Sequence, residues 1–93
     1  MAMTDTIRDK LMRALSPVAV TVDDESMLHE GHAGARPGGE THFRVRIVSA
    51  AFNGLSRVER QRQVYAALRE EMDNRIHALA LTTLTPDEAQ SSR

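Results

Sequence analysis

The sequence contains no cysteine. This absence excludes disulfide bonds, a catalytic thiol and a cluster site built only from the chain's own thiolates. No apolar run approaches the roughly 18 residues of a membrane span, and the first residues lack the basic and apolar segments of a secretory signal. We therefore expect a cytoplasmic protein with no membrane contact. The net charge of −1 is low for a nucleic-acid binder, because such proteins usually carry a clear positive charge.

The sequence does contain four histidines, and they are the main candidates for chemistry. His77 lies in the apolar run 76–81, which predicts a buried strand. A buried imidazole must be hydrogen-bonded or have a function, so His77 is either a core residue or a metal ligand near the strand's start. His29 and His32 are either solvated side chains of a glycine-rich stretch, or one of them shares a metal with His77. His42 is expected to be a surface residue of the sheet, with a position beside a metal site as the alternative.

The length of 93 residues predicts a single domain over residues 1–93, with a core at about 5–88 and a disordered tail at 89–93. The predicted elements, in chain order, are a helix over 5–15, a strand over 18–23, a flexible loop over 24–39, a strand over 40–48, a helix over 57–73 and a strand over 76–82. Pro86 starts a possible last turn. Thr4 is the expected N-cap of the first helix, and Pro17 is expected to end it.

The main helix has a clear N-terminal signal, because Ser56 and Glu59 have the spacing of a capping box. Its expected apolar stripe consists of Leu55, Val58, Arg62, Tyr65, Leu68 and Met72, with Arg62 contributing its aliphatic stem.

Alternation along the strands predicts the sheet. Phe43, Val45 and Ile47 should face one way, and His42, Arg44 and Arg46 the other; Val18, Val20 and Val22 should share one side of the first strand. The first two strands should be antiparallel, and the right-handed crossover rule makes the second and third parallel. The predicted fold is therefore α+β, with a three-stranded mixed sheet, helices on one face and the other face open.

Three arginines in the first turns of the main helix, Arg57, Arg60 and Arg62, have two interpretations. They form either a solvated face paired with neighbouring acids, or a contact for an anion or nucleic acid aided by the helix N-terminus. The Gly31-x-x-Gly34 pattern lies between two strands, the wrong place for clamping a nucleic-acid backbone. Since no P-loop, nucleophile elbow or H-E-x-x-H motif is present, an enzyme is the least supported class.

An ordered set of short stretches over about residues 5–88 resembles the BolA-like family. These stretches are Asp24-Glu25-Ser26 followed by His29, Gly39 to Val45, Val48-Ser49, Phe52-x-Gly54, Ser56 to Val58 with Arg60-x-Arg62-x-Val64-Tyr65, and Ile76 to Ala80. One departure is Gln61, which stands between two arginines where the family commonly has a histidine.

The resemblance implies a KH-like (class II) α-β-β-α-β fold and a monothiol glutaredoxin as partner. In such complexes a [2Fe–2S] cluster is shared, with thiolates from glutaredoxin and glutathione. His77 matches the family's strand ligand, His29 matches its loop ligand, and His32 is a nearby alternative. The isolated chain is expected to hold no cluster and to be a monomer or weak homodimer. The alternative is a DNA-binding transcriptional regulator that uses Arg57, Arg60 and Arg62.

Overall fold

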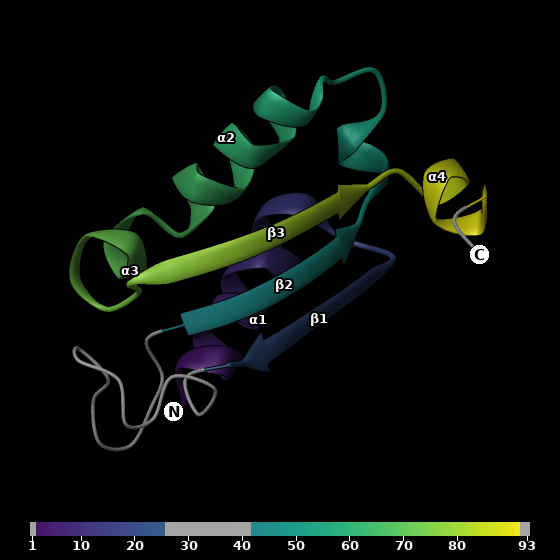
Figure 1. Cartoon of the computed structure of the whole chain (residues 1–93). Helices are drawn as coiled ribbons and strands as arrows, with labels where there is room; N and C mark the ends of the chain where they lie inside the picture. Colours follow the sequence, from purple (N-terminus) through teal and green to yellow (C-terminus); the bar gives the residue numbers. More distant parts are fainter. Residues whose placement is uncertain (1, 26–41, 92–93) are drawn as a thin grey trace.

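The computed structural model describes residues 2–25 and 42–91. Its elements are α1 (Met3–Leu15), β1 (Ala19–Asp24), β2 (His42–Val48), the 3-10 turn η2 (Ala50–Phe52), α2 (Arg57–Ala67), α3 (Arg69–Asn74), β3 (Ala78–Leu84) and α4 (Pro86–Ser91). The strands lie in the order β1-β2-β3, with β1 antiparallel and β3 parallel to β2 (Figure 1). Both expected pairings, and the α+β class with a mixed sheet, are thus confirmed.

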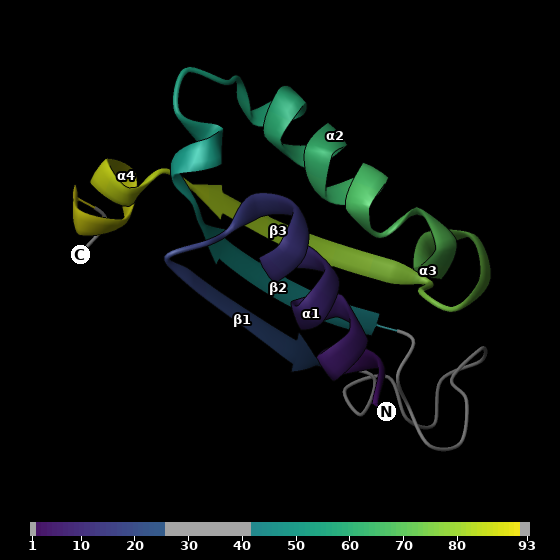
Figure 2. The ribbon, with the colours of Figure 1, turned by 180° about the vertical axis from the view of Figure 1, so that it is seen from behind.

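The helices α1 and α2 cover one face of the sheet, as Figure 2 shows from behind. Phe43, Val45 and Ile47 of β2 are buried beneath them, while Arg44 and Arg46 are exposed on the opposite face. The alternation predicted for this strand is therefore confirmed. The wider core comprises Met3, Ile7, Leu11, Leu15, Val22, Phe52, Val64, Leu68 and Ile76. Val22 of β1 is buried. Val18, predicted to share its side of the strand, lies one residue before β1 and is exposed.

The start of α1 differs from the prediction. The helix begins at Met3, with Ala2 as its N-cap, so Thr4 lies inside the first turn and the predicted Thr4 cap is wrong. An earlier start brings the buried Met3 side chain into the core. The predicted end is confirmed, since Ser16, the residue before Pro17, leaves the right-handed helical region with φ 43° and ψ 54°.

The main helix is divided, which the sequence pattern did not indicate. It breaks at Leu68, which separates α2 from α3. The capping box at its start is confirmed: Ser56 Oγ accepts from the Glu59 amide at 3.2 Å, and Glu59 Oε1 accepts from the Ser56 amide at 3.0 Å.

The buried face of α2 also differs from the predicted stripe. The row Arg60, Val64 and Leu68 packs inward, whereas Val58 and Tyr65 are 55% and 40% exposed. Arg62, another member of the predicted stripe, is exposed as well. The predicted stripe is thus confirmed at Leu68 and Met72, which pack in or against the core, and is wrong at Val58, Arg62 and Tyr65. The inward position of Arg60 was missed because a buried, hydrogen-bonded arginine looks polar in the sequence.

The C-terminal part has more order than predicted. The third strand runs over 78–84 instead of 76–82, and the helix α4 extends to Ser91, so the expected disordered tail is wrong as far as that residue. The missed signal is Thr85-Pro86-Asp87-Glu88, a capping box with proline at the first helical position. The predicted loop over 24–39 lies outside the described residues, except for Asp24 and Glu25.

Candidate functional site

The imidazole of His77 lies at the surface, at the bend just before β3. Its neighbour Ile76 is buried instead, with 5% exposure. The interpretation of His77 as a core histidine is therefore wrong. The strand β3 begins at Ala78, the residue after His77, and the chain turns at His77 before it enters the sheet. An exposed imidazole is free to act as a ligand toward another molecule.

A second histidine lies beside it. His42 is the first residue of β2, and the parallel register pairs it with Ala78, the residue after His77. The ring centroids of His42 and His77 are 6.0 Å apart, with an interplanar angle of 66°. His42 is half-buried and in edge-to-face contact with His77, so of its two interpretations the structure favours the neighbour of the candidate ligand over the simple surface residue.

The chain leaves and re-enters the sheet at this same end. The amide of Glu25, just past β1, donates to the His42 carbonyl at 2.8 Å. The Glu25 carboxylate accepts from Arg44 Nε at 2.9 Å, and this hydrogen bond raises the pKa of Arg44. His29 and His32 lie outside the described residues, in the segment between these two anchor points.

The described residues hold no group of three or more histidine, cysteine, aspartate or glutamate side chains that could bind a metal. Most metals need more ligands than one or two imidazoles. Among residues 2–25 and 42–91, His42 and His77 therefore do not make a complete metal site by themselves.

The arginines of α2 do not form one exposed face. Arg60 is only 7% exposed: Nε donates to the Leu55 carbonyl at 3.0 Å, and Nη1 to the Thr83 carbonyl at 3.1 Å. Nη1 and Nη2 also donate to the two oxygens of Glu88 at 2.6 and 3.2 Å. Arg60 therefore holds the fold together, and its prediction as a nucleic-acid contact is wrong. Arg57 and Arg62 remain exposed.

The fold and these contacts define an α+β domain with one covered and one open sheet face, and with histidines at one sheet end. The family model BolA, described as BolA-like protein, matches residues 11–88. The chain belongs to the BolA-like family.

Relatives support the same assignment. The chain is 47% identical over 87 residues to protein BOLA1, chloroplastic, of Arabidopsis thaliana, covering 91% of this chain and 54% of that protein. It is 51% identical over 80 residues to human BolA-like protein 1, covering 86% of this chain and 56% of the relative. The chain thus spans little more than half the length of these relatives.

A solved structure of BolA1 from Arabidopsis thaliana superimposes with a TM-score of 0.84 at 43% identity, covering 95% of this chain and 96% of the other. No described helix of this chain is long and apolar enough to cross a membrane.

Proposed function

We propose that this protein is an adaptor that binds a monothiol glutaredoxin and co-ligates a [2Fe–2S] cluster for iron–sulfur trafficking. The observation that carries the proposal is the exposed His77 at the start of β3, in contact with His42. The described residues on either side of the stretch that contains His29 and His32 are Glu25 and His42, and the Glu25 amide donates to the His42 carbonyl beside this pair.

The proposed ligand set is the one that the resemblance to the BolA-like family implies, and it suits a chain without cysteine. Thiolates for the cluster come from the glutaredoxin and from glutathione, and this chain adds His77 together with His29 or, as the alternative, His32. Neutral imidazole in place of thiolate raises the reduction potential of such a cluster. The chain holds and passes on the cluster without turnover, in the cytoplasm, where thiols are kept reduced.

The test is a titration of this protein into glutathione-bound [2Fe–2S] monothiol glutaredoxin, followed by visible circular dichroism. We expect a new spectrum that saturates at a one-to-one ratio and is lost in His77→Ala. The matched control is Arg75→Ala, which changes an exposed residue two positions away and should retain the new spectrum.

A titration that leaves the visible spectrum unchanged, or a His77→Ala protein that forms the same mixed cluster as the wild type, would overturn the proposal. Separate His29→Ala and His32→Ala variants then assign the second ligand, since only the variant lacking that ligand should lose the mixed-cluster spectrum.

A further inference from the structure

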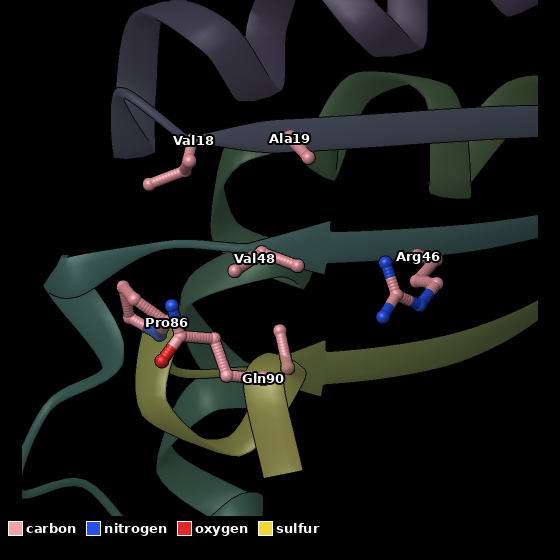
Figure 3. Close-up of a pocket in the computed structure, with 7 residues that line it drawn as sticks. Val18, Ala19, Arg46, Val48, Pro86 and Gln90 are labelled. Atoms are coloured by element: carbon pink, nitrogen blue, oxygen red, sulfur yellow. The ribbon is translucent and has the colours of Figure 1, made fainter. Parts of the chain in front are cut away.

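A shallow hollow lies at the opposite end of the sheet from His77, on the open face (Figure 3). It has a volume of about 350 Å³ and is enclosed by the start of β1, the end of β2 and the helix α4. Its lining consists of Val18, Ala19, Arg46, Val48, Pro86, Ala89 and Gln90.

Most of this lining is apolar. Val48 is buried at 4% exposure, whereas Val18 is 72% exposed, the highest value among the large hydrophobic side chains of the described residues. Pro86 lies across the hollow from Val18, and both Pro86 and Ala89 of α4 are half-buried lining residues. An apolar side chain from another molecule would remove this surface from water, which is favourable.

One cation borders the hollow. Arg46 is exposed, and its guanidinium end points toward the space between Val48 and Gln90 (Figure 3). Its neighbour on the same face, Arg44, is paired with Glu25, but within the described part of the chain no ion pair of Arg46 is found. The residues opposite Arg46 in the sheet are Thr21 and Thr82, both uncharged.

We propose that this hollow is a docking site for a segment of a partner protein that carries an apolar side chain next to an acidic one. The apolar side chain lies against Val18 and Val48, and the carboxylate pairs with Arg46. A single cation and a lining without aromatic residues do not suit a nucleic-acid strand, which needs stacking surfaces and several phosphate contacts. The proposal does not depend on the histidine site.

The test uses the full-length 15N-labelled protein and a blocked tetrapeptide, acetyl-glycyl-leucyl-glutamyl-glycine amide, with a matched peptide in which glutamine replaces glutamate. We expect the glutamate peptide to shift the amide resonances of Val18, Val48 and Ala89 in a saturable manner. The glutamine peptide should bind about fivefold more weakly, the upper range for an exposed ion pair.

Variants separate the charged from the apolar contribution. Arg46→Gln should weaken binding of the glutamate peptide about fivefold, to the affinity of the glutamine peptide. Val18→Ser should weaken binding of both peptides. The controls are Arg57→Gln and Val58→Ser, which change an exposed arginine and an exposed valine of α2, on the covered side of the sheet, and should leave binding unchanged.

Equal affinity for the two peptides, or unchanged binding in Arg46→Gln, would overturn the proposal. So would tighter binding of a leucine peptide with a free C-terminus, which would indicate recognition of a terminal carboxylate. If the same resonances shift on raising the protein concentration without peptide, the occupant is a second copy of this chain, and the proposal is again overturned.

Discussion

The side chain of Ser49 connects the end of one helix to the end of a strand. It is fully buried; its Oγ donates to the Leu15 carbonyl at 2.7 Å and accepts from the Ala51 amide at 3.1 Å. Its own amide donates to the Leu84 carbonyl at 3.0 Å. One small polar residue thus satisfies backbone groups of α1 and η2 and pairs with the end of β3.

Ser49→Ala should lower the free energy of unfolding by about 1–2 kcal/mol, because the buried hydrogen bond to the Leu15 carbonyl and the part-buried one from the Ala51 amide are both lost. Urea denaturation followed by far-ultraviolet circular dichroism measures the change. The control is Ser91→Ala, at the exposed end of α4, which should stay within about 0.5 kcal/mol of the wild type. Similar values for both variants would show that the Ser49 hydroxyl contributes little.

At the scale of the element, the carboxylate of Glu88 links α4 to α2 and to the end of β3. Glu88 accepts from Arg60 of α2 and from the amide of Thr85, the residue that precedes α4. The Thr85 hydroxyl in turn accepts from the Glu88 amide at 3.2 Å. The hydrogen bond from Arg60, followed by that from the Thr85 amide, lowers the pKa of Glu88 to about 2.

Acid should therefore weaken the attachment of α4. The pKa of Glu88 is lower in the folded state than its ordinary value of 4.5. The ionised carboxylate therefore adds to the free energy of unfolding above pH 4.5, and this stabilisation is lost as the pH falls toward 2. Thermal unfolding of the wild type and Glu88→Gln at several pH values should show a stability gap at pH 7 that closes across this window. The control is Asp73→Asn, which removes one exposed negative charge elsewhere. A gap that persists unchanged at pH 2 would contradict the prediction.

At the scale of the whole molecule, the histidine pair and the hollow lie at opposite ends of the sheet. The histidine pair lies where β2 begins, and the hollow beside Val48 lies where it ends. The seven residues of this strand span about 20 Å. Surfaces this far apart on one sheet can contact two molecules without either one blocking the other.

This arrangement predicts that the two sites act independently, because substitutions so far apart with no shared contacts have additive effects. Arg46→Gln should leave the mixed-cluster spectrum with glutaredoxin unchanged, and His77→Ala should leave binding of the glutamate peptide unchanged. The double variant should lose both. Loss of the cluster spectrum in Arg46→Gln would instead show that the hollow is part of the glutaredoxin interface.

The candidate site could be predicted only in part. Four histidines in a chain without cysteine, with His77 inside the predicted strand 76–82, made histidine the candidate ligand type, and the role of His77 stays a prediction. Its exposure could not be predicted, because burial depends on where the strand begins, and a shift of two residues moves His77 out of the sheet. The contact between His42 and His77 needs the parallel register of β2 and β3, which joins residues 35 positions apart in the chain.

By itself, the sequence determined the order of the elements and the composition of the sheet. Two of these features are local: the strict alternation of β2 and the capping box of Ser56 and Glu59. The parallel pairing of β2 and β3 follows from the handedness of the crossover between them. None of the three requires knowing which distant residues come into contact. Only the tertiary structure decided which face of α2 is buried and what Arg60 does. Arg60 is paired with Glu88, 28 residues further along the chain, and a buried charge is stable only where distant segments supply its hydrogen bonds.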